Sequence, residues 1–458
     1  MSSTASLARE LAPPGPGAPG AARAAMRRLA RVRLTGRGTA LLCAGVVLTG
    51  GGVVLELPDL VGLGAAAVLV VVASWTVMGV QRLDAGRGAL DVTRTLSPHP
   101  VVRGQTTAVR LEVGARARTG AAYERLARLR LSEQAAHELA GPHGIRARVT
   151  AHPDRLSVRY TLEPARRGRW ALGPLLTTRT DVFSLARTTQ PLGATTLVAV
   201  RPRTVDLSTR SHVLGDVDRA ATGARLASTD DSVLREYVAG DDPRRVHWAG
   251  SARQGRLMVR ADESAGVRPV TVLLDRSTLP PPPESRATSR PAAHGTRGVD
   301  HGERAVELAA SVAVAFLEAG RPARLVGSAP GPVETPFSSG AGLGRAAVLD
   351  AAVDLRGHRS AAAATEAIVA TARSLRLNRT GAEVTVAVLA PQAEAARHEL
   401  ATLAADGTCW AVVLTPQDVS DDAARTVADL RQAGWRVAVC DAGTPPAQAW
   451  SLLAERVS

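Results

Sequence analysis

The densest group of side chains that could do chemistry lies between residues 235 and 263. It combines arginines, carboxylates and one histidine, which build charge-assisted hydrogen-bond networks and serve in acid–base catalysis. Its members are Arg235, Glu236, Tyr237, Gly240, Asp241, Asp242, Arg245, His247, Trp248, Ser251, Arg253, Arg260 and Glu263. Asp242 is a good helix N-cap and Pro243 suits the first helical position. We therefore expect a short helix here, with Trp248 buried.

Two uses of this cluster have to be weighed. The neighbouring arginines would keep Asp241 and Asp242 ionised, which suits a salt-bridge hub better than a general acid. His247 stands next to Trp248, and a structural role is favoured for it. A solvated charged linker and a hydrolase that uses the Arg, Asp and His247 side chains remain open alternatives. A second candidate site is Asp275 with Ser277, directly after the apolar run 269–274.

The composition excludes several kinds of chemistry. The chain has 458 residues and a formal net charge of +14, and all 56 basic residues are arginine. Without lysine there can be no P-loop lysine, Schiff base or lysine general base. No GxSxG, HExxH or Walker pattern occurs, so we expect no enzyme. The positive charge favours lipid headgroups over nucleic acid as the partner, and the three cysteines carry no metal-ligand spacing.

Two apolar runs near the N-terminus predict a transmembrane helical hairpin. Residues 39–55 and 60–80 contain no charge, and the second run is long enough to cross a bilayer. The glycine tract at 50–52 is tolerated in lipid, where small residues let helices approach. The turn is Glu56-Leu57-Pro58-Asp59, whereas arginines flank the pair on both sides. This asymmetry predicts a multi-pass protein of the cell membrane with both termini and the soluble domains in the cytoplasm.

The elements after the hairpin separate into two types. Period-two alternation at 89–96, 107–113, 145–151 and 156–163 predicts an antiparallel β-sandwich. A turn at Arg166-Arg167-Gly168 is expected to carry exposed arginines. Beyond residue 268, apolar strand runs at 269–274, 323–327, 383–390, 409–415 and 435–441 alternate with helices at 303–320, 344–355, 361–375, 392–405, 420–433 and 446–456. This alternation predicts a doubly wound parallel sheet, and Asp275 and Ser277 would lie at its carboxyl edge.

The cluster at 235–263 resembles the hallmark segment of the bacterial domain-of-unknown-function family 58. That family shows R-E-Y, G-D-x-x-R-x-I-x-W, S-A-R, a downstream R-x-x-E and a strand that ends in D-x-S. This chain matches at Arg235-Glu236-Tyr237, at Gly240 to Trp248 with Val246 in place of Ile, and at Ser251-Ala252-Arg253, Arg260, Glu263, Asp275 and Ser277. The resemblance extends upstream through 168–174 and 180–185 to the membrane hairpin.

The resemblance implies a C-terminal von Willebrand factor A-like domain and a MoxR-type AAA+ ATPase as partner. A metal-adhesion site in that fold uses Asp-x-Ser-x-Ser, which binds Mg²⁺ through hard oxygen ligands. Here Asp275-Arg276-Ser277-Thr278-Leu279 lacks the last hydroxyl, and Arg276 adds a positive charge. A strand-end cap is therefore favoured over a Mg²⁺ site, and no cofactor is expected. A metal-dependent binding module through Asp275 and Ser277 stays an alternative.

Together these observations predict a membrane protein of mixed α and β structure. Its expected parts are a disordered tail at 1–33, a transmembrane hairpin at 34–82, a β-sandwich at 87–207, a linker with the family motif at 208–267, and the α/β domain at 268–458. The predicted function is that of a membrane-anchored scaffold or adaptor that works with an AAA+ ATPase in envelope or complex assembly.

Overall fold

The computed structural model describes residues 26, 29–81, 83, 89–117, 119–127, 129–141, 144–207, 234–236, 248, 251–252, 255–260, 268–281, 296–378, 383–415 and 420–454. The chain forms two compact units. The first unit comprises Met1–Val101, Gln105–Ala165 and Trp170–Val198. The second unit comprises Ala199–Ser458 together with two short segments, Val102–Gly104 and Arg166–Arg169. Each unit is described by itself.

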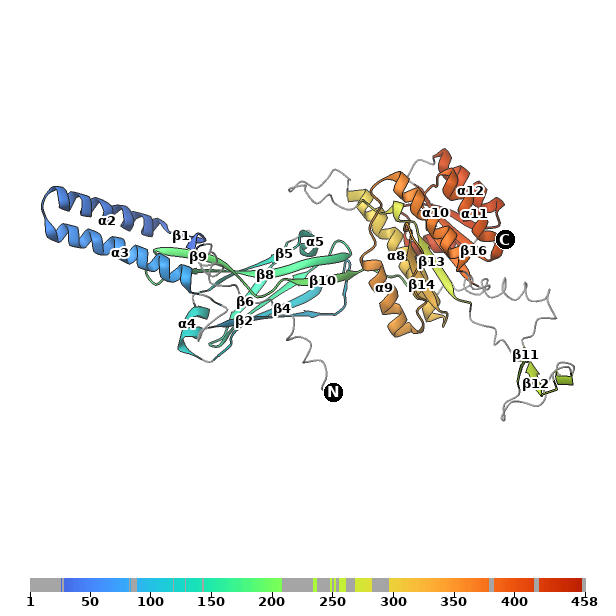
Figure 1. Cartoon of the computed structure of the whole chain (residues 1–458), viewed down its shortest axis with the longest axis horizontal. Coiled ribbons are helices and arrows are strands. Elements are labelled where there is room, and N and C mark those ends of the chain that lie inside the picture. Colours follow the sequence, from blue (N-terminus) through green and yellow to red (C-terminus); the bar gives the residue numbers. More distant parts are fainter. Residues whose placement is uncertain are drawn as a thin grey trace. The chain divides into compact units, whose positions relative to one another are not determined.

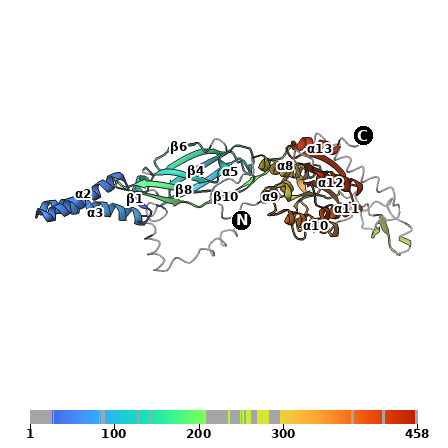
Figure 2. The same cartoon turned by 90° about the horizontal axis from the view of Figure 1, so that it is seen from above.

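Two apolar helices stand at the start of the first unit. Helices α2 (Gly36–Val54) and α3 (Pro58–Val80) lie side by side in both views (Figures 1 and 2) and are long and apolar enough to cross a membrane. Glycines allow their close contact, because a Cβ on Gly64 would lie 2.6 Å from the carbonyl oxygen of Gly45. Most of their large side chains point away from protein, including Val47 and Leu69. Apolar surface of this extent is rare on proteins surrounded by water.

The rest of the first unit contains two sheets. In one, β1 (Val32–Leu34), β9 (Ala186–Leu192), β8 (Gly168–Thr180), β10 (Thr196–Arg201) and β3 (Val101–Val102) follow one another, and β5 (Arg130–Ala135) pairs with β8. The other is antiparallel, in the order β2 (Leu90–Ser97), β4 (Thr107–Ala115), β7 (Arg155–Leu162) and β6 (Ala147–Ala151). The sheets meet where Arg94 of β2 binds Glu133 of β5 at 2.9 Å. Helices α4 (Gly120–Ala127) and α5 (His137–Ala140) are short connections.

The helical hairpin is held firmly on the sheet that contains β8. Arg179 of β8 is buried and donates to the carbonyl oxygens of Met78 and Gln81 at 3.1 and 3.2 Å, which are acceptors left open at the end of α3. At the other helix, Thr35 caps α2 and binds the backbone oxygen of Ser184 at 2.5 Å. Trp75 and Met78 pack against Val32 of β1. The hairpin is therefore fixed at its base by polar and apolar contacts.

The second unit is built on a parallel sheet of five strands. Their order is β14 (Ala323–Gly327), β13 (Val270–Leu274), β15 (Val384–Leu389), β16 (Cys409–Thr415) and β17 (Arg436–Asp441). These are the strands that the apolar runs predict, because strands covered on both faces have nearly continuous apolar sequences. Buried polar exceptions such as Thr271 of β13 and Arg324 of β14 bind each other. Short turns η5 (Arg276–Thr278), η6 (Gly340–Gly344) and η7 (Ala404–Asp406) complete the connections.

Helices cover both faces of this sheet (Figure 1). Helices α8 (Thr296–Glu318), α9 (Arg345–Val353) and α13 (Pro446–Ala454) pack on the face that carries Val272. Helices α10 (Ala361–Leu377), α11 (Glu394–Leu403) and α12 (Asp421–Gln432) pack on the face that carries Leu273. The expected helices are present. Helix α8 begins before residue 303, and the sequence does not reveal its first turns because they are polar and lack the apolar period.

Candidate functional site

The strand order reverses beside β13, and two polar side chains meet there. From β13 the chain passes first to β14 on one side and later to β15 on the other, which makes this the switch point where doubly wound sheets open a crevice for ligands. Asp275 follows β13 and Gln392 lies shortly after β15. The sequence predicts the position of Asp275, but it carries no signal for Gln392 as its partner.

The carboxylate of Asp275 is buried and accepts four hydrogen bonds. Its Oδ1 accepts from the backbone N–H of Ser277 at 2.9 Å. Its Oδ2 accepts from Ser277 Oγ at 2.6 Å, from Gln392 Nε2 at 2.6 Å and from the backbone N–H of Ala390 at 3.2 Å. Three of these four donors converge on Oδ2 and one on Oδ1. Asp275 therefore closes the crevice and ties β13 to the segment after β15.

This arrangement does not fit a divalent cation. Mg²⁺ requires oxygen acceptors pointing at a common centre, whereas Ser277 Oγ and Gln392 Nε2 both present hydrogens to Asp275. Within the part of the chain that the structure describes, no group of three or more His, Cys, Asp or Glu side chains could hold a metal. The strand-end cap favoured by the sequence agrees with this geometry.

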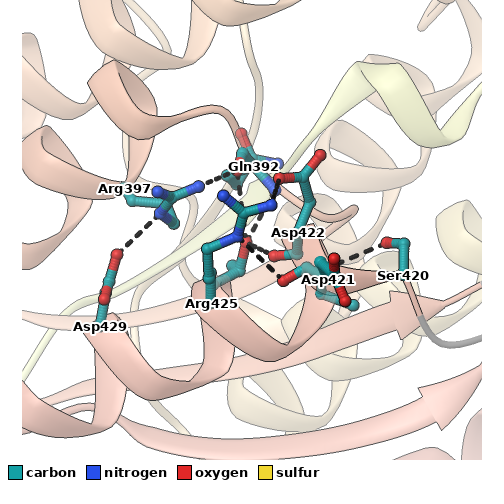
Figure 3. Close-up of polar contacts among 9 residues, drawn as sticks. Gln392, Arg397, Ser420, Asp421, Asp422, Arg425 and Asp429 are labelled. Carbon is teal, nitrogen blue, oxygen red and sulfur yellow. Dashed lines mark hydrogen bonds and ion pairs between the residues drawn. The ribbon is translucent and has the colours of Figure 1, made fainter.

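Gln392 is itself held from the opposite side by helices α11 and α12 (Figure 3). Its backbone N–H donates to Thr426 Oγ1 at 2.9 Å, and its carbonyl oxygen accepts from Arg397 Nη1 at 2.9 Å. Arg397 is buried and also binds Asp429 at 2.7 Å. Around this buried core, Asp421, Asp422 and Arg425 of α12 are exposed. The switch point is therefore rigid inside and presents charged side chains outside.

A serine–histidine pair lies on the other side of Asp275. Ser328 Oγ accepts from the backbone N–H of Arg276 at 2.9 Å and is 3.1 Å from His358 Nε2. Burial and the nearby Arg276 lower the pKa of His358, which favours the neutral ring. Ser328 is 0% exposed, so a substrate carbonyl could not reach its hydroxyl. The pair therefore fits a structural contact better than a nucleophile and its base.

A buried network of arginines and glutamates lies against helix α8 in the second unit. Arg167 is 7% exposed and binds Glu303 of α8 at 2.7 Å, while its other nitrogens donate to the carbonyl oxygens of Ala352 and Leu355 at 3.1 and 2.6 Å. Arg103 binds Glu307 of α8 at 2.5 Å and lies 3.7 Å from Glu303. Buried charges of this kind are tolerated only when they are paired.

The expectation of exposed arginines at the turn 166–168 is therefore wrong for Arg167. The sequence does contain a signal for its partners, because Glu303 and Glu307 are four residues apart and share a helix face with Val306 and Ala310. Two acids inside an apolar stripe predict buried cationic partners. Which arginines among so many would supply the charge could not be read from spacing alone.

The network should make stability depend on pH through Glu307. Burial raises the pKa of Glu307, opposed by Arg103 and reinforced by Glu303. The folded chain then holds this proton more tightly than the unfolded chain, so the free energy of unfolding falls as pH rises through the interval between the two pKa values. Each tenfold difference in proton affinity is worth about 1.4 kcal/mol. Glu307→Gln cannot titrate and should lack this contribution.

Urea unfolding of wild type and Glu307→Gln between pH 4 and 8 (about the range around a carboxyl pKa) measures the effect. The wild type should gain stability relative to the variant as the pH is lowered. Glu318→Gln, at the exposed end of the same helix, is the control and should follow the wild type. A constant difference between wild type and Glu307→Gln over the whole range would contradict the expected linkage.

The cluster at 235–263 lies only partly within the described residues. Strands β11 (Leu234–Glu236) and β12 (Met258–Arg260) pair antiparallel, with Arg235 opposite Val259 and Leu234 opposite Arg260. Ser251 is half-buried. Trp248 is 71% exposed, so its expected burial is wrong for the chain taken by itself. The remaining members lie outside the described residues: Tyr237, Gly240, Asp241, Asp242, Arg245, His247, Arg253 and Glu263.

Comparison with solved structures gives remote similarities. A von Willebrand factor type A protein from Catenulispora acidiphila shares 12% identity over 41% of this chain, with a TM-score of 0.26. The chain covers 41% of the length of that protein. The PilB minor pilin from Streptococcus sanguinis shares 10% identity over 71% of this chain and 76% of its own length, with a TM-score of 0.27.

Comparison of the sequence with protein families assigns residues 233–389 to a known family. No curated protein matches the chain. The model of the family described as "Protein of unknown function DUF58" matches residues 233–389. The matched stretch begins just before Arg235-Glu236-Tyr237 and extends to the end of β15, so it contains Asp275 and Ser277. Residues 233–389 are thus a DUF58 segment, which confirms the resemblance carried by the Arg-Glu-Tyr, Gly-Asp and Asp-x-Ser residues.

Proposed function

We propose that this chain is a membrane-anchored scaffold or adaptor. Its hairpin of α2 and α3 spans the cell membrane, both termini and both units are cytoplasmic, and the partner is an AAA+ ATPase of the MoxR type in envelope or complex assembly. The partner class comes from the family resemblance. The observation that carries the proposal is the apolar hairpin, whose large side chains face outward while its base is locked to a folded unit by Arg179 and Thr35.

The orientation follows from the charges at the ends of the helices. Arg31, Arg33 and Arg37 are exposed at the start of α2, whereas Glu56 and Asp59 mark the turn between the helices. Arginines are retained on the cytoplasmic side of membrane helices. A hairpin with an acidic turn and arginines at its base therefore places the turn outside the cell and the sheets inside.

Fractionation and labelling test the anchoring and the orientation. The full chain should stay in the membrane pellet after alkaline carbonate extraction and enter solution only with detergent. In a Cys43→Ala background, Glu56→Cys should react with a membrane-impermeant maleimide in intact cells, and Ser360→Cys, on the second unit, only after lysis. Recovery of the full chain from the carbonate supernatant would defeat the proposal. Labelling of Ser360→Cys in intact cells would show that the second unit lies outside the cell, opposite to the proposed orientation.

The outer rim of the switch point is the proposed contact for the ATPase. Asp275 and Gln392 close the crevice by binding each other, which leaves no small-molecule site between them. The exposed side chains there include Asp421, Asp422 and Arg425 of α12. Exposed charges on a rigid support suit recognition of a protein surface, because they steer association and fix its orientation.

Site-specific crosslinking tests this partner. A photoreactive p-benzoylphenylalanine replaces Arg425 in the full chain, and the matched control carries it at Val149 on β6, which is also exposed. After illumination of native membranes and mass spectrometry, Arg425→p-benzoylphenylalanine should capture an AAA+ ATPase and the control should not. Repeated absence of any AAA+ protein at Arg425, with the chain intact in the membrane, would count against the ATPase as partner.

A further inference from the structure

The turn between β8 and β9 exposes two large apolar side chains. Val182 is 70% and Phe183 is 66% exposed. The turn is nevertheless ordered from within, because Asp181 Oδ1 accepts from the backbone N–H of Ala186 at 2.8 Å and the carbonyl oxygen of Asp181 accepts from the N–H of Ser184 at 3.1 Å. Ser184 has a φ of 59°, a left-handed conformation that is costly outside glycine. The fold thus holds two adjacent apolar side chains out of the protein on a rigid support.

The strand register places this turn at the base of the helical hairpin. Strand β1 leads directly into α2, and Leu34 at its end pairs with Ala186 at the start of β9. Because the two strands are antiparallel, the turn before Ala186 points in the direction in which β1 enters α2. The backbone N–H of Thr35 donates to the carbonyl oxygen of Leu185 at 2.9 Å. β1 and β9 lie beside the base of α2 and α3 in Figure 1.

Two arginines face each other on the same pair of strands. Arg33 and Arg187 are directly opposite in the register, and both are exposed. Like charges in opposite positions of an antiparallel pair are destabilising. Neither arginine forms an ion pair with another described residue. An anion bound by both guanidinium groups would relieve this repulsion.

We infer that the Val182–Phe183 tip enters the boundary between headgroups and acyl chains of the cytoplasmic leaflet, while Arg33 and Arg187 bind the phosphates of anionic lipids. The inference rests on the proposed membrane anchoring of α2 and α3, and it adds a second attachment. Apolar side chains next to basic ones are the composition of surfaces that lie in the membrane interface, and juxtamembrane arginines are attracted to anionic leaflets. With the hairpin and the tip both embedded, the first unit would hold one fixed orientation on the bilayer.

Depth-dependent quenching in vesicles tests the inference on the full chain. The environment-sensitive fluorophore NBD is attached at Val182→Cys in a Cys43→Ala background, which leaves Phe183 in place; Cys409 and Cys440 are buried. Two matched positions serve as references: Leu69→Cys on α3 and Val149→Cys on β6, both exposed in the protein. Each variant is reconstituted into phosphatidylcholine vesicles with and without phosphatidylglycerol. Lipids with a shallow or a deep doxyl group and aqueous iodide are the quenchers.

The label at 182 should be blue-shifted, quenched by the shallow doxyl lipid and protected from iodide, whereas the label at 149 should be quenched by iodide alone. Phosphatidylglycerol should strengthen the quenching at 182, and Arg33→Gln with Arg187→Gln should abolish that increase. Phe183→Asp should move the label at 182 into water while the label at 69 stays quenched by the deep doxyl lipid, which shows that the hairpin is still inserted.

The outcomes separate the two proposals. If the label at 69 is quenched by the deep doxyl lipid but the label at 182 behaves like that at 149, the tip does not insert and the inference is overturned, while the anchoring stands. If the label at 69 is itself open to iodide, the anchoring fails and the inference falls with it. If the quenching at 182 changes neither with phosphatidylglycerol nor with the two arginine substitutions, Arg33 and Arg187 do not bind anionic lipids as proposed.

Discussion

Arg167→Leu is expected to lower the free energy of unfolding of the second unit by about 3–5 kcal/mol, the cost of removing one partner of a buried ion pair. The loss has two sources. Among the described residues, Glu303, which is 6% exposed, would keep only Arg103 at 3.7 Å as a counter-charge. The carbonyl oxygens of Ala352 and Leu355 would also lose the donors that now lie 3.1 and 2.6 Å away, and an unpaired buried acceptor costs about 1–3 kcal/mol.

Urea unfolding of the full chain in detergent, followed by tryptophan fluorescence, measures this effect. Trp410, Trp435 and Trp450 are buried in the second unit and report its unfolding. Arg169→Leu is the matched control, because Arg169 is two residues away but half-exposed with its partner Asp354. Such an exposed pair contributes about 0–1 kcal/mol.

A double variant separates the ion pair from simple packing. Replacing both Arg167 and Glu303 with Leu removes the unpaired charge, so it should destabilise the second unit less than the sum of the single changes. Strictly additive losses would mean that the two charges do not stabilise each other. A loss below about 1 kcal/mol for Arg167→Leu alone would show that Arg167 is not buried in solution.

Asp275→Ala should be the second most damaging change, with an expected loss of about 2–4 kcal/mol from several buried donors left without an acceptor. The backbone N–H groups of Ser277 and Ala390 and the amide of Gln392 all point at this carboxylate. Losing it would also detach β13 from the segment after β15 at the switch point. The comparison Asp422→Ala removes an exposed carboxylate on α12 and should cost less than about 1 kcal/mol.

The same variant distinguishes a strand-end cap from a metal site. For the cap, Mg²⁺ should leave the thermal midpoint of the wild type unchanged, because the carboxylate of Asp275 already accepts hydrogen bonds from Ser277, Ala390 and Gln392. A ligand that binds only the folded state raises stability in proportion to the logarithm of its concentration. A midpoint that rises with Mg²⁺ in the wild type and not in Asp275→Ala would restore the metal-dependent binding module as the better hypothesis.

The sequence alone determines the elements whose side chains follow a simple period. The two uncharged runs predict α2 and α3, and the apolar strand runs predict β13 to β17, because strands buried on both faces have nearly continuous apolar sequences. The DUF58 segment is also visible in the residues around Arg235 and Gly240. These features are local in the chain, so neighbouring residues are sufficient to reveal them.

The tertiary structure decides which charged residues meet. All the basic residues are arginine, so nothing in the sequence marks Arg167 as buried, Arg179 as the cap of α3, or Arg33 and Arg187 as opposite each other. Their roles depend on partners more than a hundred residues away, such as Glu303 for Arg167 and Met78 for Arg179. Gln392 closes the site at Asp275 for the same reason. Local propensity determines where an element begins and ends. Only packing brings distant polar groups close enough to replace their hydrogen bonds to water with hydrogen bonds to each other.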